Sequence, residues 1–458
     1  MPSDPLLFGY SLAVDIETMA RQGDALHLHL AGGRSVTLAC PDLRGEKIVE
    51  RLQAGPASHA ALADICSDSM LVRILSQLAL NQVLHWHFGP PDRPFCRVES
   101  FSGTYCPIYH PAEAAVLRQP LSRFACLRQE QGETILQNAE LHARLVFLPG
   151  GQDVLAATLA DPTPSAWRHF LFCTGFLEPV AAESPARESW EFHDLLFHDA
   201  TRLFVGERPI GKRDRLKGKH PKPEKIAPPL SQDRIALPPV DTDRASASLR
   251  QVMALRRSLR EPGEWPLQLA DLSTFLGRTL QAQLKPDRPD DRRFRPMPNG
   301  GGAHELEFYI LIQRCAGLDA GLYQYRESEH ALYRLPANAA LAKRATLLSA
   351  GAMGTEEAPP DCVILMASRL PKIAREYEGI AYRLSLLHAG VAMQSFYLVA
   401  TDMGLSPCAN GSGDSLVFER LTGLPLLQET AIAEFALSGR RVTTPAGPAA
   451  DSERPPLH

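Results

Sequence analysis

Four side chains that could bind a phosphate lie together at the end of a predicted helix, at Arg256, Arg257, Ser258 and Arg260. Guanidinium groups bind phosphate through paired hydrogen bonds, and a nearby hydroxyl adds a further donor. Arginines at the end of a helix also commonly do no more than complement the helix dipole. The cluster therefore indicates either an anion site or an ordinary helix end.

A run of glycines, Pro298-Asn299-Gly300-Gly301-Gly302, precedes an apolar strand predicted over Glu307–Gln313. Glycines let the backbone approach a flat ligand closely, because no side chain stands in the way. No Gly-Lys-Ser/Thr follows, so this is not a Walker loop, and no strand immediately precedes it, so it is not the dinucleotide fingerprint. The run indicates a backbone surface for a planar ligand.

Ionisable side chains gather just before a long apolar helix, at Arg375, Glu376, Tyr377, Tyr382 and Arg383. Such groups at the entry of a buried element are typical of an active-site rim, because burial and neighbouring charges shift their pKa values. A carboxylate and a phenol can both transfer protons. An alternative is that Glu376 only forms a surface ion pair with Arg375 or Lys372.

The helix that follows these groups is predicted over Leu384–Val399 and is apolar nearly all round. Its interruptions carry no fixed charge, and they are Ser385, His388, Gln394 and Ser395. Such a helix must be buried in a large core or between subunits. A membrane span is the alternative, but Arg383 and Asp402 bracket only ~18 residues and there is no second such segment, so we expect no membrane association.

The composition is that of an ordinary globular protein with room for two or three domains, at 458 residues, 45% apolar and 22% charged. The net charge of −4 argues against general affinity for nucleic acid or anionic membrane. The N-terminus lacks a basic segment followed by an apolar one, so we expect no secretion signal. The nine cysteines include no C-x-x-C pair, which predicts no metal site and suits a reducing cytoplasm.

The N-terminal half shows one structural plan twice. A hairpin predicted over residues 24–39 is followed by helices at Lys47–Leu52, His59–Cys66 and Ser69–His85, the last capped by Ser69. Residues 120–178 repeat a hairpin and a further strand, followed by helices at Gln152–Leu159 and Ser165–Phe176. This repetition indicates an internal duplication, with winged-helix-like domains over residues 1–95 and 96–200.

A winged-helix plan raises DNA binding, which needs a recognition helix with several Arg or Lys that reach base edges. The two candidate helices carry one arginine each and no lysine. A groove between a strand edge and a helix can instead accept an extended peptide as an added strand. We therefore expect these domains to clamp a peptide and to bind no nucleic acid.

A Pro-rich linker is predicted over residues 201–247. Between Arg202 and Lys225, nine Lys or Arg stand against three Asp or Glu. This excess indicates either a solvated connector or a basic arm that contacts an acidic peptide. His193 and His198, which precede the linker on a predicted helix, are expected to be packed or surface residues and not metal ligands. The Pro/Ala-rich tail, residues 443–458, is expected to be disordered.

The ordered set of segments resembles one family. RRSLR at 256–260, PNGGGAHELEFY at 298–309, Tyr377 with Tyr382-Arg383 and Ala389-Gly390, and FALSGRR at 435–441 follow the order seen in the nitroreductase-like flavoprotein superfamily. The chain is most similar to the SagB-type (McbC-like) thiazole/oxazole dehydrogenases, whose longer members carry two N-terminal winged-helix peptide-clamp domains. The resemblance implies an α+β fold over residues 248–442, with a mixed sheet wrapped by helices, and an obligate homodimer.

That resemblance also implies FMN bound at the dimer interface. The residues that would hold its phosphate are Arg256, Arg257, Ser258 and Arg260, joined by Arg440 or Arg441. Those that would run along the isoalloxazine ring are Pro298, Asn299, Gly300 and Gly301. The reaction implied is oxidation of a thiazoline or oxazoline to the azole, in which a ring carbon gives a hydride to the flavin, a base removes a proton, and oxygen then takes the electrons.

One position departs from the family pattern, because Glu376-Tyr377 stands where family members usually carry Lys-Tyr. We expect Tyr377 to transfer the proton and Glu376 to orient substrate. The implied partners are a modified precursor peptide and other pathway enzymes, such as a cyclodehydratase. Two alternatives stay open: an NAD(P)H-dependent flavin reductase of nitro, quinone or ene groups, and a catalytically inactive peptide-binding scaffold.

Overall fold

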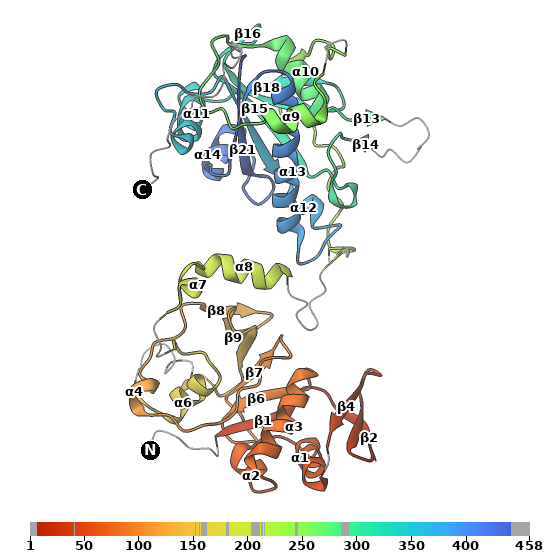
Figure 1. Cartoon of the computed structure of the whole chain (residues 1–458), viewed down its shortest axis with the longest axis vertical. Helices are drawn as coiled ribbons and strands as arrows, with labels where there is room; N and C mark the ends of the chain where they lie inside the picture. Colours follow the sequence, from red (N-terminus) through yellow and green to blue (C-terminus); the bar gives the residue numbers. More distant parts are fainter. Residues whose placement is uncertain are drawn as a thin grey trace. The chain divides into compact units, whose positions relative to one another are not determined.

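The computed structural model of the chain divides into two compact units, residues 1–209 and residues 210–458 (Figure 1). It describes residues 7–40, 42–151, 153–154, 156, 163–179, 183–202, 211, 214, 216–242, 246–284 and 293–440. The helix predicted over Gln152–Leu159, the tail at 443–458 and Arg441 lie outside the described residues, at least in part, so those predictions are not taken further.

The first unit is built on a seven-stranded sheet with the order β5-β1-β6-β7-β10-β9-β8. Its strands are β1 (Phe8–Leu12), β5 (Ala57–Ser58), β6 (Leu84–Phe88), β7 (Cys96–Ser100), β8 (Ala125–Glu130), β9 (Glu133–Asn138) and β10 (Ala143–Phe147). A smaller sheet contains β2 (Ile16–Gln22), β3 (Ala25–Leu30) and β4 (Ser35–Ala39). Antiparallel β3 and β4 confirm the hairpin predicted over residues 24–39, and β8 with β9 confirms the second hairpin.

Helices cover these sheets, and most begin at a residue that caps the first turn. They are α1 (Leu43–Gln53), α2 (His59–Ala63), α3 (Asp68–Leu80), α4 (Ala114–Leu117), α6 (Ala166–Cys173), α7 (Pro185–Glu188) and α8 (Phe192–Arg202). The helix predicted over Ser165–Phe176 is α6, in which Ser165 is the N-cap residue and accepts the Arg168 N–H.

The helix predicted over Ser69–His85 is wrong at both ends. Ser67, not Ser69, is the N-cap residue of α3, and the helix ends at Leu80. Gln82 has a positive φ of 54°, which turns the chain out of the helix. The following residues form β6, in which Leu84, Trp86 and Phe88 alternate into the core.

Residues 1–95 and 96–200, predicted as two domains, share one sheet and one core. Antiparallel pairing of β6 with β7 joins the two halves, and one hydrophobic cluster runs from Phe8 to Leu177. A continuous core is what makes residues 1–209 one compact unit. The winged-helix-like character of the two halves stays a prediction.

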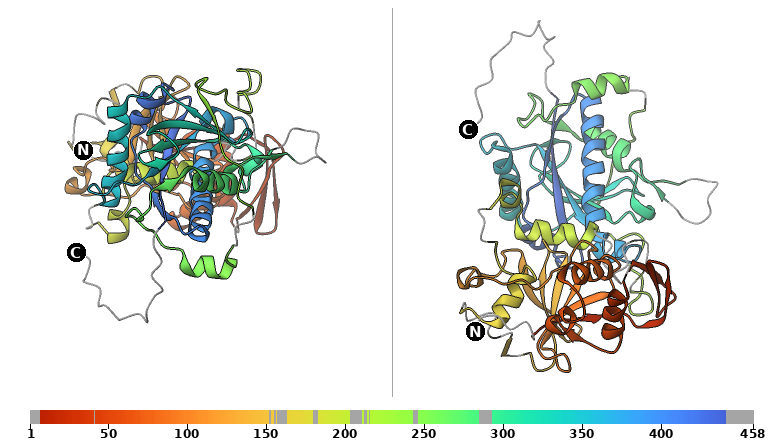
Figure 2. Two further views of the ribbon diagram at one scale, coloured as in Figure 1. Left: turned by 90° about the horizontal axis from the view of Figure 1, so that it is seen from above. Right: turned by 60° about the horizontal axis from the view of Figure 1, so that its bottom comes forward.

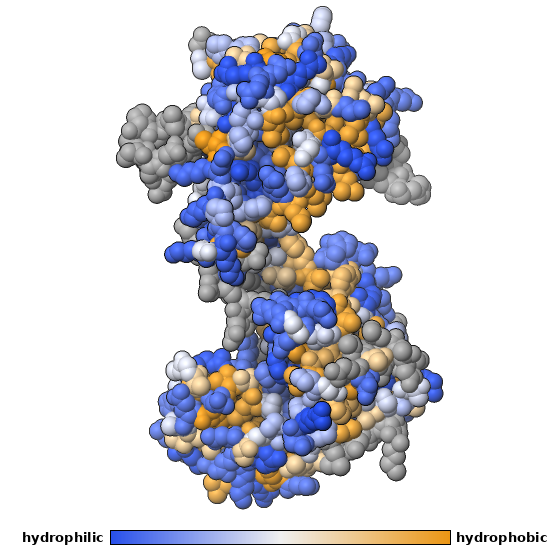
Figure 3. Space-filling view, turned by 180° about the vertical axis from the view of Figure 1, so that it is seen from behind, coloured by the Kyte–Doolittle hydropathy of each residue, from blue (hydrophilic) through white to orange (hydrophobic). Residues whose placement is uncertain are grey.

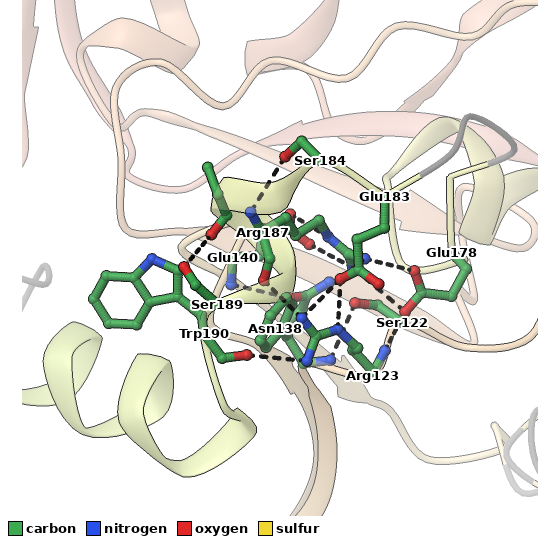
Figure 4. A network of polar contacts seen from close by, with 12 residues as sticks. Ser122, Arg123, Asn138, Glu140, Glu178, Glu183, Ser184, Arg187, Ser189 and Trp190 are labelled. Carbon is green, nitrogen blue, oxygen red and sulfur yellow. Dashed lines mark hydrogen bonds and ion pairs between the residues drawn. The ribbon is translucent and has the colours of Figure 1, made fainter. Parts of the chain in front are cut away.

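A polar network ties the end of the first unit back to its sheet (Figure 4). Arg187 of α7 pairs with Glu140 (2.8 Å) and Glu178 (3.0 Å), and Arg123 pairs with Glu183 (2.7 Å). Both guanidiniums lie over the ring of Phe124, at 4.9 and 4.3 Å from its centroid. These contacts combine charge pairing with cation–π attraction and fix the chain between β10 and α8.

The second unit contains another seven-stranded sheet, with the order β11-β18-β17-β15-β19-β21-β20. Its strands are β11 (Arg234–Ala236), β15 (Leu306–Ile312), β17 (Gly321–Arg326), β18 (Ala331–Arg334), β19 (Cys362–Ser368), β20 (Ser406–Asn410) and β21 (Thr430–Ser438). Among the described strands of this sheet every pair is antiparallel, so the expected mixed sheet is corrected. Among the strands that the structure describes, parallel pairing is confined to the short β12 (Leu267–Gln268) and β16 (Cys315–Ala316).

Helices pack on both faces of this sheet (Figures 1 and 2). They are α9 (Leu249–Leu255), α10 (Leu269–Leu280), α11 (Ala339–Met353), α12 (Leu370–Ile373), α13 (Ala381–Asp402) and α14 (Ser415–Thr422). Alternate residues of β15 explain the two layers: Phe308 and Ile310 pack with α10 and α13, while Tyr309 and Leu311 pack with α11 and α14. A short hairpin, β13 (Gln283–Leu284) with β14 (Arg293–Phe294), stands beside them.

The predicted apolar helix Leu384–Val399 is confirmed as α13. Ala392 and Phe396 are fully buried in the sheet core, whereas Leu387 is 56% exposed. It is the one helix in the described part of the chain that is long and apolar enough to cross a membrane, and 33% of that segment is buried. It therefore combines a core face with apolar residues, such as Leu386 and Leu387, that the described part of the unit leaves exposed.

Part of the predicted linker 201–247 is packed onto the second unit and is not a solvated connector. Leu237 lies in the core cluster, and β11 pairs with β18 at the edge of the sheet. Arg375 is buried, forms an ion pair with Asp214 (3.2 Å), and donates to the carbonyl groups of His220 and Pro221. A buried guanidinium needs such partners, and here they anchor the basic segment.

Candidate active site

The glycine run folds into a tight turn, residues 298–302, which we call the glycine turn. Its core is a single 3-10 turn, η1 (Gly300–Gly302), directly before β15. Gly301 and Gly302 have φ angles of 62° and 67°, a region that residues with a Cβ atom avoid. Both glycines are exposed, so the turn presents bare backbone at its surface.

Three side chains, those of His388, Glu305 and Asn299, hold the glycine turn through hydrogen bonds. His388 of α13 accepts the Gly300 N–H at Nε2 (2.8 Å), and its Nδ1 lies 2.7 Å from Glu305 Oε1. Asn299 Nδ2 donates to the other carboxylate oxygen of Glu305 (3.1 Å). Asn299 Oδ1 accepts the His304 N–H (3.0 Å). The turn is therefore bonded to the central helix through a closed polar network.

The charge of this network is set by Glu305, which is fully buried. Burial alone disfavours a carboxylate, but the hydrogen bonds from His388 and Asn299 outweigh burial and hold the pKa of Glu305 below its ordinary value. Because its charge is met by hydrogen bonds on both oxygens, Glu305 stays ionised inside the fold.

Tyr377 packs on the same turn. A Cβ atom placed on Gly301 would lie 2.9 Å from Tyr377 Oη, and one on Gly300 would lie 3.5 Å from it. The phenol hydroxyl therefore lies against the backbone of the glycine turn, in space that only glycine leaves open. Of the predicted catalytic pair, the structure brings Tyr377 to the turn.

Glu376 is half-buried, and in the described part of the chain its side chain has no hydrogen bond or ion pair. The two cations that could have paired with it are engaged elsewhere. Arg375 pairs with Asp214, and Lys372 donates to the carbonyl groups of Lys225 (2.6 Å) and His304 (2.7 Å). The alternative in which Glu376 forms a surface ion pair with either cation is therefore wrong.

The predicted phosphate-binding residues after α9 make different contacts. Ser258 Oγ lies 2.7 Å from Tyr397 Oη of α13, and the Arg256 guanidinium lies 5.2 Å from the centre of the Tyr397 ring. Arg257 turns back onto the carbonyl groups of Ala254 and Arg256. The Ser258 and Tyr397 hydroxyls and the Arg256 guanidinium thus lie close together, whereas the Arg257 guanidinium donates to carbonyl groups at the end of its own helix.

Arg260 continues this surface toward β20. The Leu259 N–H donates to the Pro407 carbonyl (2.8 Å), which fastens the segment to that strand. Burial raises the pKa of the Cys408 thiol, and the nearby Arg260 partly opposes the rise. None of Arg256, Arg257 and Arg260 has a carboxylate partner among the residues that the structure describes. We call Arg256, Ser258 and Arg260 the arginine cluster.

Arg440 lies beside the loop that follows the arginine cluster. A Cβ atom on Gly263 would come within 2.3 Å of the Arg440 carbonyl oxygen, and one on Gly439 within 2.0 Å of the Trp265 carbonyl oxygen. The two backbones therefore run directly against each other. The Arg440 guanidinium pairs with Asp271 (2.5 Å), so its charge is partly neutralised.

A second group of buried ionisable residues lies on the α11 and α14 face of the sheet. Burial raises the pKa of Glu429 to about 7, and Tyr309 donates to it (2.7 Å). Burial also lowers the pKa of Lys372 to about 8. A surface hollow of about 470 Å³ lies elsewhere in the second unit and contains none of the predicted site residues; it is lined by Asp233, Ile235, Cys315, Gly317, Leu318, Asp319, Tyr323 and Arg334.

Sequence reasoning did not assign His388, Glu305 or Tyr397 to the site. His388 was visible only as a polar interruption of an apolar helix, and Tyr397 as one more large residue of that helix. Glu305 lies three positions after the glycine run, where a polar residue usually lies at the surface of a turn. A polar residue inside an apolar helix that must find a buried partner is the one signal that could have indicated His388.

Residues 254–436 match the model of the Nitroreductase family. A Methanocaldococcus jannaschii protein, MJ1384, whose name places it among nitroreductases, is 27% identical over 164 residues, which are 36% of this chain and 78% of that protein. The part of the chain matched by the family model is therefore similar to nitroreductase-like oxidoreductases.

Three solved structures with similarity to this chain have TM-scores below one half. A Ralstonia eutropha protein named as a nitroreductase has a TM-score of 0.37 at 21% identity, over 51% of this chain and 99% of its own. An Anabaena variabilis protein of the same description has 0.39 at 15% identity, over 95% and 80%. The E. coli microcin synthetase complex McbBCD, with truncated pro-MccB17 bound, has 0.34 at 18% identity, over 52% and 85%.

Proposed function

We propose that the second unit uses FMN to dehydrogenate an azoline ring, a thiazoline or oxazoline, in a ribosomally made and modified peptide. The observation that carries the cofactor is the arginine cluster. Arg256 and Arg260 have no carboxylate partner in the described chain and stand with the Ser258–Tyr397 hydroxyl pair. Unpaired guanidiniums beside hydroxyl donors fit one phosphate group, and no dinucleotide fingerprint precedes them.

The glycine turn fits the flat ring of a flavin. Gly301 and Gly302 expose backbone without side chains, and Pro298 is exposed beside them. The side chain of Asn299 is engaged with Glu305 and His304, so this residue would offer its backbone to the ring. Bound there, FMN would supply a two-electron acceptor for a hydride from the substrate.

Helix geometry favours a flavin bound between two copies of the chain. His388 touches the glycine turn and Tyr397 touches the arginine cluster, and the two residues are nine positions apart on α13. Nine positions are about two and a half helical turns, so the two side chains leave the helix on opposite sides. One copy would then give its arginine cluster to a flavin whose ring lies on the glycine turn of the other.

The exposed apolar residues of α9 and α13 support a homodimer. On α9, Leu249, Met253 and Leu255 are 69%, 54% and 66% exposed, and on α13, Leu386 and Leu387 are 38% and 56% exposed. Figure 3, seen from the opposite side to Figure 1, shows further hydrophobic side chains on the surface, among polar ones. An apolar area of this kind indicates a partner surface, and we propose that a second copy covers it.

The roles of the two rim residues follow from their positions. Tyr377 Oη lies against the glycine turn, and in its phenolate form it is the group placed to take a proton from a substrate carbon at the turn and become the phenol. Glu376 is half-buried on the rim without an internal partner, and it can orient the substrate by accepting a hydrogen bond. Tyr377 is therefore the proposed proton acceptor, and Glu376 a substrate-binding residue.

A basic surface near Tyr377 supports a peptide substrate with acidic residues. Lys217, Lys219 and Lys222 are exposed on the segment that Arg375 anchors, two positions before Tyr377. Exposed cations attract acidic chains over about a Debye length, ~8–10 Å at ordinary ionic strength. We propose that the peptide is held here and by the first unit, in the cytoplasm, and is delivered by a pathway enzyme such as a cyclodehydratase.

A second candidate is an NAD(P)H-dependent reductase of nitro, quinone or ene groups. It is favoured by the name of MJ1384 and by the glutamate at position 376. A third is a peptide-binding scaffold without activity. The 200-residue first unit favours the peptide oxidase over a simple reductase, which needs no such addition.

The test begins with the purified full chain. We expect it to be yellow, to release FMN and not FAD on denaturation, and to reduce its flavin when given a thiazoline-containing model peptide. A colourless protein that takes up no added FMN would exclude every flavin-based role. Flavin reduced by NADPH and reoxidised by nitrofurazone, with no reaction of the peptide, would select the reductase.

A further inference from the structure

We propose that His388 is a positioning residue, whose neutral imidazole holds the glycine turn in the shape that receives the flavin ring. This inference rests on the proposed flavin site, but it concerns contacts within this chain. His388 is 7% exposed and bridges α13 to the turn through Gly300 N–H (2.8 Å) and Glu305 Oε1 (2.7 Å).

The hydrogen-bond network admits one arrangement of protons. Nε2 faces the Gly300 N–H, which can only donate, so Nε2 must carry a lone pair. The imidazole proton therefore sits on Nδ1 and points at Glu305 Oε1. Asn299 Nδ2, also 3.1 Å from Nδ1, then donates to Glu305 Oε2. The Gly300 N–H, the Nδ1 proton and one Asn299 N–H each have an acceptor in this arrangement, and the opposite tautomer would set two donors face to face.

Groups on every element packed against His388 agree with this assignment. From the turn come Gly300 N–H and Asn299, from the start of β15 comes Glu305, and Tyr377 Oη lies over the far side of Gly300 and Gly301. One turn earlier on α13, Ser385 pairs with Ser368 (2.9 Å) and is buried. Glu305 is thus the charged group that faces the imidazole, and it fixes the proton on Nδ1.

The hydrogen bond to His388 determines which backbone atoms of the glycine turn remain available to a flavin. The Gly300 N–H is bound to His388, so the turn cannot rotate this donor outward without breaking a buried hydrogen bond. Gly301 and Gly302, whose φ angles are positive, are then held in one of the many conformations open to glycine. His388 removes this freedom before a ligand binds, which favours binding by preorganisation.

Two conservative substitutions separate the two contacts. The amide of Gln in His388→Gln can reach the place of Nε2 and accept the Gly300 N–H, whereas the shorter His388→Asn can reach the place of Nδ1 and donate to Glu305. Ser395→Ala on the same helix is the control, because Ser395 bonds only the Val391 carbonyl one turn away. Each variant keeps a polar contact for a buried partner and is expected to fold.

The measurement is FMN affinity of the full chain by quenching of flavin fluorescence, with the flavin midpoint potential and visible spectrum as further readouts. We expect wild type, Ser395→Ala and His388→Gln to agree, and His388→Asn to bind FMN roughly tenfold more weakly with an altered potential. Far-UV circular dichroism checks that each variant is folded.

The outcomes distinguish this inference from the proposed function. Wild type that binds no FMN excludes the flavin site itself. Wild type that binds FMN, with His388→Asn matching it in affinity, potential and spectrum, overturns the positioning role while leaving the flavin site intact. Weak binding by both Asn and Gln variants, with normal folding, also overturns it, because restoring the Gly300 contact would then have no effect.

Discussion

The glycine turn and the arginine cluster are the two halves of the candidate site, and they are built in opposite ways. In the glycine turn, Gly300, Asn299 and Glu305 all find partners inside the fold, with His388 at the centre. In the arginine cluster, the guanidiniums of Arg256 and Arg260 reach the surface with no carboxylate partner in the described chain. The polar groups of the glycine turn are hydrogen-bonded within the fold, whereas the arginine cluster carries positive charge that can bind an anion.

This difference indicates how each half would treat a ligand. A turn whose backbone donors are already hydrogen-bonded can fix the shape of a binding surface, but it contributes little binding energy, because those donors are not available to a ligand. Unpaired arginines gain charge-assisted hydrogen bonds when an anion arrives, each of ~1.5–3 kcal/mol. We infer that the arginine cluster supplies affinity and the glycine turn supplies orientation.

The largest effect is expected from α13, because this helix carries both His388 and Tyr397. Phe396→Asp would place a charge in a fully buried site and should unfold the second unit, at a cost of several kcal/mol. Leu387→Asp, at a position that is 56% exposed, should leave the fold intact and split the proposed homodimer. Sedimentation and circular dichroism distinguish the two results.

Flavin occupancy provides the control for that experiment. If flavin is bound between copies, the Leu387→Asp monomer should lose FMN while keeping its secondary structure. A folded Leu387→Asp monomer that binds FMN as tightly as wild type would show that one copy forms the whole site. It would also refute the geometry argued from the opposite sides of α13.

Removing the charge of the arginine cluster should come next in size. Arg256→Ala with Arg260→Ala deletes two contacts, worth together ~3–6 kcal/mol, so FMN should be lost during purification. Arg257→Ala is the matched control, because this side chain bonds carbonyl groups of its own helix. Unchanged flavin content in the double variant would place the phosphate elsewhere.

The glycine turn is tested by substitution of Tyr377, which should change the rate of flavin reduction and not the affinity for flavin. Tyr377→Phe keeps the ring on the glycine turn and removes the hydroxyl, so flavin should stay bound while reduction by a thiazoline peptide slows ~10²–10⁴-fold. Glu376→Gln should be milder, since it keeps a hydrogen-bond acceptor. Single-turnover flavin reduction measures both, and an inactive Gln variant beside an active Phe variant would exchange the two roles.

Much of the second unit could be predicted from local patterns. The apolar run of α13, the alternation in β15 and the glycines with positive φ all have short-range causes that a sequence shows. The bonds of Asn299 to Glu305 and of Gly300 to His388 could not, because 88 positions separate Gly300 from His388 in the chain. Pairing of polar groups that are far apart in the sequence depends on the fold and produces no periodic pattern in the sequence.

The first unit shows the same limit at a larger scale. The hairpins at 24–39 and 123–137 were predictable, because tight turns and alternation are local. The pairing of β6 with β7, which joins both halves in one sheet, was not, and residues 81–85 were assigned to a helix. Likewise the sequence left open whether the basic segment is a solvated connector or a peptide-binding arm, because its buried anchor, Arg375, lies 155 positions from His220.

The smallest expected effect is on the pH dependence of stability, which we compare for two buried carboxyl groups. One lies near the glycine turn and the other near the arginine cluster. Glu305, beneath the glycine turn, has a lowered pKa because hydrogen bonds from His388 and Asn299 outweigh its burial. Glu434 of β21 contacts Asn410 (3.1 Å) on β20, the strand that also holds the arginine segment, and burial raises its pKa to about 7. A lowered pKa stabilises the fold above the ordinary value of 4.5, and this contribution is lost as the pH falls below it. A raised pKa stabilises the fold at low pH, and this contribution is lost as the pH rises through about 7.

The two Gln variants should therefore have opposite pH profiles in urea unfolding of the full chain. Relative to wild type, Glu434→Gln should gain ~2–3 kcal/mol in unfolding free energy between pH 5 and 8, because the variant needs no proton to stay neutral. Glu305→Gln should be less stable than wild type at pH 7, with a difference that shrinks below pH 4.5, where the wild-type carboxylate gains its proton. A Glu305→Gln variant that instead gains stability over wild type as the pH rises, as Glu434→Gln is expected to do, would show that Glu305 is neutral in the fold. The glycine turn would then have no buried anion at its base, and the proton on His388 Nδ1 would lack the acceptor that fixes it there.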